Sequence, residues 1–184
     1  MRRLALAVVI AVALLVGSVG MTVASTTPTL VAHGPTSVSG TEESAVFRIG
    51  DRTVRQIRYA DRQVLVYSFA LANEGRLPVT VTGLAPLERT PRLFRYVGLT
   101  DAAGQKEFTI GGGERTTVEV SLLMHACETL SARAGSFATE VNVRTEQAGM
   151  VEDVVKVAFP EEVHTGSPRE TFCPNATATS RPPG

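Results

Sequence analysis

Three side chains with affinity for soft metals lie close together in the sequence. Met124, His125 and Cys127 offer a thioether, an imidazole and a thiol, which are donor types that copper accepts. Side chains alternate along an extended strand, so His125 and Cys127 would share one face. No further ligand is evident nearby. Met124 and His125 are therefore weak metal candidates, and we predict no cofactor.

Cys127 and Cys173 are the only cysteines and stand 46 positions apart. Their spacing is not the Cys-x-x-Cys pattern of a redox motif. In an oxidising compartment two such cysteines are most simply joined as a structural disulfide, which competes with a metal role for Cys127. We predict the disulfide.

Signals for catalysis are absent from the sequence. His33, His125 and His164 are the only histidines, and a triad or a three-histidine metal site would require distant segments to converge. The chain contains no nucleophile elbow, Walker loop, zinc-protease motif or dinucleotide fingerprint. We expect a protein that is not an enzyme.

One segment contains the only local run of basic residues. Its arginines are Arg48, Arg52, Arg55, Arg58 and Arg62. Asp51 and Asp61 interrupt the run, which favours a solvated strand face with mixed ion pairs. The alternative is contact with an anionic surface, such as lipid headgroups or envelope polymers. The whole chain has 18 basic and 18 acidic residues, a balance that gives no support for nucleic-acid binding.

The first 24 residues predict the compartment. Arg2 and Arg3 precede 21 uncharged residues, Leu4 to Ala24, a length that suits a single membrane-spanning helix with its basic end inside the cell. Retention as an anchor would leave the remainder extracytoplasmic on the cell membrane. Cleavage near Ala24, after Thr22-Val23-Ala24, would instead secrete it.

Composition divides the remaining chain into three parts. Residues 25–44 are rich in Ser, Thr, Gly and Pro, which predicts a flexible linker. Residues 45–159 form the expected folded body. Residues 160–184 return to a Pro-rich composition and predict a tail, which the disulfide ties back in part.

Apolar residues in the body alternate with period two, which is typical of strands. The clearest case is Leu65, Tyr67, Phe69 and Leu71. Similar patterns occur around Val79, Val118, Phe137 to Val143 and Val151 to Phe159. About seven short strands separated by turns predict an all-β protein, an antiparallel β-sandwich. The stretch Ala85 to Lys106 is expected to be irregular.

Several segments resemble a known group of domains. Phe69-Ala70-Leu71-Ala72-Asn73-Glu74-Gly75, followed by Pro78-Val79-Thr80-Val81-Thr82-Gly83-Leu84, is similar to an element of Hydin-type and major-sperm-protein-like immunoglobulin-like domains. Phe108 to Val120 and Gly135 to Val141 match the later strands of that pattern. The resemblance implies an immunoglobulin-like sandwich that acts as a non-catalytic interaction or spacer module. Asn and Gly tolerate left-handed backbone at a strand reversal, which makes the Asn73-Glu74-Gly75 turn physically reasonable.

Together these features predict an exported domain, tethered to the membrane by its N-terminal helix. It would serve as an interaction or accessory module of the cell envelope and bind a protein partner there. The alternative is a metal-binding, copper-type or chaperone-like domain that uses Met124, His125 and Cys127.

Overall fold

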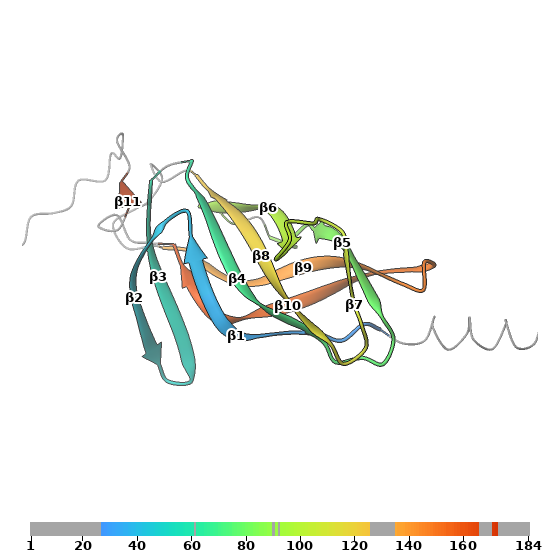
Figure 1. Cartoon of the computed structure of the whole chain (residues 1–184). Helices are drawn as coiled ribbons and strands as arrows, with labels where there is room; N and C mark the ends of the chain where they lie inside the picture. Colours follow the sequence, from blue (N-terminus) through green and yellow to red (C-terminus); the bar gives the residue numbers. More distant parts are fainter. Residues whose placement is uncertain are drawn as a thin grey trace, which may run out of the picture.

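The protein folds into two β-sheets packed face to face (Figure 1). A computed structural model describes residues 27–60, 62–89, 91, 93–125, 135–165 and 171–172. In this part of the chain all regular structure is β-strand. The predicted all-β class is confirmed. The predicted helix at residues 1–24 lies outside the described residues, and across the described ranges no helix meets the length and hydropathy that a membrane crossing requires.

Sheet A has four strands, and every neighbouring pair in it is antiparallel. In spatial order they are β1 (Leu30–Ser39), β4 (Val64–Asn73), β8 (Arg115–Met124) and β6 (Phe94–Asp101). Sheet B has seven strands. In order they are β11 (Thr171–Phe172), β3 (Arg52–Ala60), β10 (Val151–His164), β9 (Phe137–Gln147), β5 (Val79–Ala85) and β7 (Phe108–Ile110), with β2 (Glu42–Ile49) paired to β3.

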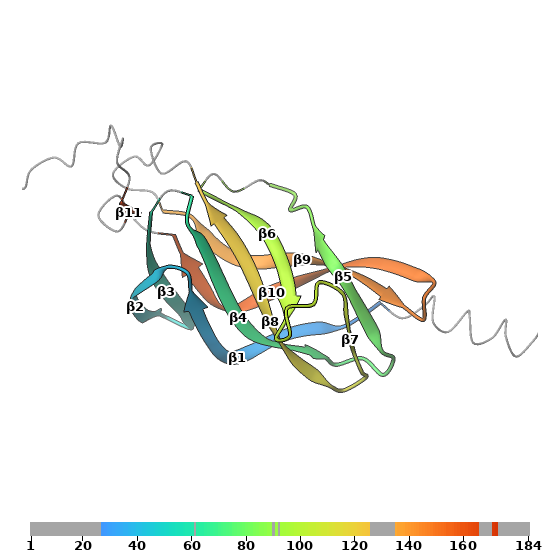
Figure 2. The same cartoon turned by 45° about the horizontal axis from the view of Figure 1, so that its top comes forward.

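Sheet B departs from the predicted antiparallel arrangement, because β3 pairs in parallel with both β10 and β11. Parallel neighbours need a long connection, and the chain supplies one, since it crosses both sheets between β3 and β10. Two hairpins extend from the body in opposite directions, β2–β3 at one corner and β9–β10 at the other side (Figures 1 and 2).

The core lies between the sheets and confirms the reading of the central strand. Leu65, Tyr67, Phe69 and Leu71 on β4 are each at most 1% exposed. Phe159 of β10 packs its ring 5.0 Å from Tyr67 and 5.5 Å from Phe69, centroid to centroid. Burying these aromatic rings contributes much of the hydrophobic stabilisation of a domain this size.

The predicted pattern at Phe137 is wrong about the face of the strand. Val141 and Val143 are buried as expected, but Phe137 is 46% exposed and Ala138 is buried in its place. The ladder between β9 and β10 shifts register between Ala158 and Val163. An irregularity of this kind exchanges the inward and outward positions of a strand.

The folded body extends beyond the predicted limits of 45 and 159 at both ends. The expected linker contains β1 and the start of β2, and β10 continues past Pro160 to His164. The expected irregular stretch Ala85 to Lys106 contains β6. β1 and β6 are the edge strands of sheet A, and an edge strand needs fewer buried side chains, so its sequence shows weak alternation.

The turn after β4 does not use the left-handed backbone that Asn and Gly tolerate. Among the described non-glycine residues only Arg62 and Ala148 have positive φ, and Gly75 is not among the glycines that do. Asn73 acts through its buried side chain instead. Its Nδ2 donates hydrogen bonds to the carbonyls of Leu77 (2.8 Å) and Ile110 (3.1 Å), and its Oδ1 accepts one from the Gly75 N–H (3.0 Å).

Candidate functional site

A basic depression lies at one end of sheet A. Arg62, Arg95, Leu123 and His125 line it, and its volume is about 430 Å³. Arg95 and Leu123 are partners across the β6–β8 ladder, and Val64 is the partner of Leu123 on the other side. Three basic side chains therefore surround an apolar floor, an arrangement suited to anionic groups.

Backbone hydrogen bonds fix the segments that carry these side chains. Arg62 has a φ of 63° in the turn before β4, and its N–H donates to the Met124 carbonyl at 2.9 Å. Met124 donates in turn to the Gln63 carbonyl, and His125 donates to the Leu93 carbonyl, both at 2.9 Å. The depression is thus built on three segments that are held together by the main chain.

The depression is remote from the point where the described chain begins. Leu30, the first residue of β1, pairs with Asn73 at the last residue of β4. Val64, at the first residue of β4, pairs with Leu123 beside the depression. A strand of ten residues spans about 30 Å, which is the length of sheet A between these two ends.

The metal candidates do not come together within the described residues. Met124 is 0% exposed and belongs to the hydrophobic core, whereas His125 lines the depression. Guanidinium charges beside His125 oppose the binding of a cation there. Among the residues that the structure describes, no group of three or more His, Cys, Asp or Glu could hold a metal ion. Cys127 and Cys173 lie outside them.

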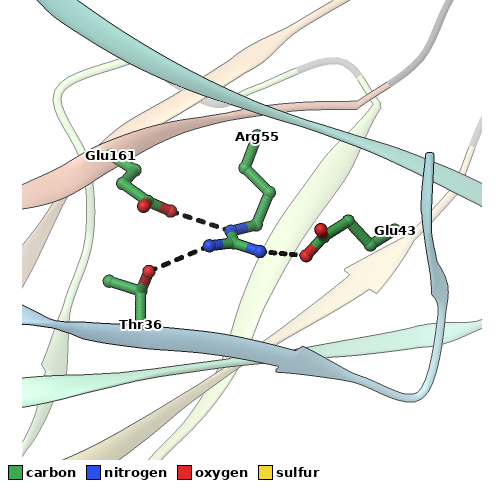
Figure 3. A network of polar contacts seen from close by, with 4 residues as sticks. All are labelled: Thr36, Glu43, Arg55 and Glu161. Atoms are coloured by element: carbon green, nitrogen blue, oxygen red, sulfur yellow. Dashed lines mark hydrogen bonds and ion pairs between the residues drawn. The ribbon is translucent and has the colours of Figure 1, made fainter. Parts of the chain in front are cut away.

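Arg55, from the predicted basic run, is an internal residue of the sandwich (Figure 3). Its side chain is 10% exposed. Nε donates to Glu161 Oε2 at 2.8 Å, Nη2 donates to Thr36 Oγ1 at 3.1 Å, and Nη1 pairs with Glu43. Thr36 belongs to sheet A and the other three residues to sheet B. The arginine therefore joins the two sheets.

The charges in this network alter the titration of its members. Burial alone would lower the pKa of Arg55, but the hydrogen bond to Glu161 and the charges of Glu161 and Glu43 outweigh burial and raise it. The pKa of nearby Tyr67 is raised as well, mainly because the phenol is buried and also because Glu161 is negative. Both shifts keep the groups in their ordinary protonation state at neutral pH.

The remaining arginines of the run do not form one cationic surface. Arg52 pairs with Glu162, and Arg58 lies 3.8 Å from Glu42. Arg48 is exposed on the edge strand β2. Of the predicted set, only Arg62 contributes to the basic depression. These contacts are mixed ion pairs, as the interruption of the run by Asp51 and Asp61 suggested. The acidic partners, however, are glutamates of other strands.

The other two histidines lie away from the depression. His33 on β1 approaches Glu74, with 3.6 Å between Nε2 and Oε1. His164 ends β10, and its ring lies 4.7 Å from that of Phe137, centroid to centroid, with the two planes tilted by 45°. Arg95 was not among the predicted site residues. Its place beside Leu123 depends on the register between β6 and β8, for which no local pattern gives a signal.

Comparisons with known proteins do not assign the chain to a family. No protein-family model matches the sequence, and no significant match was found among curated proteins. The resemblance to Hydin-type and major-sperm-protein-like domains is thus supported only as far as a β-rich fold.

One solved structure that matches is the crystal structure of the cupredoxin domain of amoB from Nitrosocaldus yellowstonii. It has 14% sequence identity and a TM-score of 0.28, over 66% of this chain and 65% of that chain. The match thus spans slightly less than two thirds of that chain.

Proposed function

We propose that the protein is a non-catalytic interaction module of the cell envelope. An immunoglobulin-like sandwich would be held at the membrane by residues 1–24 and would bind a protein partner. The observation that carries the proposal is the basic depression at the end of sheet A remote from Leu30. A tether at the N-terminus would direct this end away from the bilayer, toward partners in the extracytoplasmic space.

The chemistry of the depression indicates the kind of partner. Arg62, Arg95 and His125 surround Leu123, and the neighbouring Val64 is 39% exposed. Arginine around an apolar centre is typical of residues that dominate protein interfaces. A partner that presents carboxylates around an apolar side chain would be complementary to this surface.

The copper alternative receives less support from the same geometry. Met124 is enclosed in the core, so its thioether and the His125 imidazole would not meet without disrupting β8. Arg62 and Arg95 add positive charge beside His125, which would weaken binding of a metal cation.

Site-specific photo-crosslinking of the full chain in its native membrane tests the proposal. A photoreactive residue at position 64 should give a discrete crosslinked product. Arg62→Glu or Arg95→Glu should reduce that product by about tenfold, because each reverses a charge at the interface. Arg115→Glu is the matched control, since Arg115 is exposed and pairs with Ala72 at the other end of β8 and β4.

A second probe position separates specific binding from random contact. Met150, in the turn of the β9–β10 hairpin, is 72% exposed and lies outside the depression. It should give no equivalent product. Crosslinks that form equally from positions 64 and 150, or that survive both charge reversals, would contradict the proposal.

A further inference from the structure

A second hollow opens at the seam between the two sheets, where edge strand β6 of sheet A faces β5 of sheet B. We call it the seam cleft. Its volume is about 340 Å³, within the range of about 300–1,000 Å³ for small-molecule sites. Leu84, Leu87, Pro91 and the ring of Tyr96 form its apolar wall, and Arg95 and Arg144 stand at its rim.

Among the described residues, the two strands that border the seam have no partner on the facing side, which leaves the seam open. β5 pairs with β7 only over Val79 to Val81, and its later residues pair with β9 alone. Within the same described part of the chain, β6 pairs with β8 and no other strand. Each strand also carries a register shift, between Val81 and Gly83 in β5 and between Tyr96 and Gly98 in β6. Irregularities of this kind bend strands and recur beside functional sites.

Hydrogen bonds hold the wall of the seam cleft in shape. Asn142 donates from Nδ2 to the Pro86 carbonyl at 2.8 Å, which fixes the chain that leaves β5. The Tyr96 hydroxyl donates to the Glu140 carbonyl at 2.7 Å. Because this hydroxyl is already bonded, Tyr96 contributes its ring to the apolar surface. The cleft is therefore preformed, as small-molecule sites usually are.

The rim of the seam cleft carries positive charge from both sheets. Arg95 comes from β6 and Arg144 from β9, opposite Gly83. Gly83 has no side chain, and a Cβ there would meet no atom within 4 Å, so the space beside β5 is open. Both arginines are exposed, and within the described part of the chain neither forms an ion pair.

We propose that the seam cleft binds a single-chain anionic amphiphile of the fatty-acid class. The acyl chain lies against Leu84, Leu87 and Tyr96, where burial removes the apolar surface of its methylene groups from water. The carboxylate lies at the rim with Arg95 and Arg144, which donate charge-assisted hydrogen bonds. This inference does not depend on the proposed protein partner, and its test uses Arg144 and Leu87, which do not line the basic depression.

Photoaffinity labelling of the full chain in phosphatidylcholine discs tests the inference. The probe is dodecanoate with a diazirine at the end of its chain, and labelled residues are mapped by mass spectrometry. We expect labelling between Leu84 and Tyr96, with protection by excess dodecanoate. Arg144→Gln should reduce this labelling about tenfold through loss of a charge-assisted contact. Leu87→Asp, which places a carboxylate in the apolar wall, should abolish it.

One control variant and three alternative outcomes test whether the seam cleft binds the fatty acid specifically. Arg115→Gln removes an exposed arginine distant from the cleft and should leave labelling unchanged. Labelling confined to residues 4–24 would mean that the probe merely dissolves in the bilayer, and it would overturn the inference. Equal protection by dodecanol would overturn the role of the arginines. Protection by a short acidic peptide but not by dodecanoate would mean that the cleft binds a peptide as an added β-strand. That result would also overturn the inference of a fatty-acid site.

Discussion

Asn73 is the residue on which the turn after β4 depends. It is 0% exposed, and its amide joins the end of sheet A to Leu77 in the turn before β5 and to Ile110 of β7 in sheet B. An amide can donate to two carbonyls and accept from an N–H at once. No other side chain of the same size does all three, which explains why asparagine is needed at this position although its backbone is not left-handed.

Asn73→Asp should therefore destabilise the protein strongly. The carboxylate cannot donate to the two carbonyls, and it buries a charge, so we expect the free energy of unfolding to fall by about 3 kcal/mol. Urea unfolding followed by circular dichroism measures this. Asn142→Asp is the control, because Asn142 is 9% exposed and donates to Pro86 alone. Equal losses in the two variants would show that the amide of Asn73 has no special role.

Two tyrosines should make the protein sensitive to alkali. Burial raises the pKa of Tyr67 and of Tyr96 above the usual value, and the charges of Glu161 and Glu140 add to the effect. Above about pH 10 the unfolded chain loses these phenolic protons while the folded chain keeps them. The free energy of unfolding therefore keeps its full value below about pH 10. Above about pH 10 it falls by about 1.4 kcal/mol per pH unit for each tyrosine.

The pH dependence of the unfolding free energy checks this expectation. The double variant Tyr67→Phe, Tyr96→Phe should show a flatter profile above pH 10, although the hydrogen bond from Tyr96 to Glu140 is lost. A profile with the same slope in both proteins would contradict the assignment.

At the scale of elements, the β1–β2 turn requires glycine at one position. Gly40 has a φ of +75°, and a Cβ there would stand 2.1 Å from the Val64 carbonyl oxygen. Gly40→Ala adds left-handed strain of about 1–2 kcal/mol and also displaces the backbone of β4. We expect a total loss of about 3 kcal/mol or more in thermal or urea unfolding.

Gly104→Ala separates strain from steric conflict. Gly104 has a φ of +78°, but a Cβ there would meet no atom within 4 Å. Its variant should lose only the strain of about 1–2 kcal/mol. If the two alanine variants were equally stable, the contact between the β1–β2 turn and β4 would not be as close as described.

The elements differ in how far their sequence predicts them. β4 is predictable because it lies inside sheet A, and one whole face is buried, so apolar residues recur with period two. β1 and β6 are edge strands with few buried residues, and no clear period results. The face of Phe137 depends on a register shift in the partner strand β10. No pattern within β9 could reveal it.

The candidate site was also only partly predictable from the sequence. The sequence identified Arg62 and His125 as candidate site residues. Both lie near Arg95 only because the fold places three segments side by side. Arg55 was expected on a solvated face. It is buried because Glu43 and Glu161 neutralise it inside the fold, and partners so distant in sequence cannot be read from the run of arginines.

At the scale of the whole molecule, the attachment to the membrane is still a prediction from residues 1–24. If the helix is retained, the protein should stay in the membrane fraction after a carbonate wash, because 21 uncharged residues are long enough to span the bilayer. A mature chain that begins at Ser25, found by N-terminal sequencing, would instead show cleavage. In that case the orientation of the basic depression relative to the membrane would lose its basis.

Arg55 adds a polar contact between the two sheets to the hydrophobic core that lies between them. Thr36 in sheet A and Glu43 and Glu161 in sheet B all contact its guanidinium group. Arg55→Met keeps much of the side-chain volume but leaves Glu161, with a side chain 18% exposed, without its partner. We expect a loss of about 2–4 kcal/mol in the free energy of unfolding.

A double-mutant cycle can show that this loss comes from the pairing of Arg55 with Glu161, the neighbouring strand's carboxylate in sheet B. Glu161→Gln in the Arg55→Met background removes the unpaired charge and should restore part of the stability, whereas Glu161→Gln alone should be destabilising. Arg52→Met is the matched control, because Arg52 pairs with Glu162 at an exposed position of the same strand. Its loss should be clearly smaller. Additive effects of the Arg55 and Glu161 changes would mean that the two side chains are not coupled and that the ion pair contributes nothing to stability.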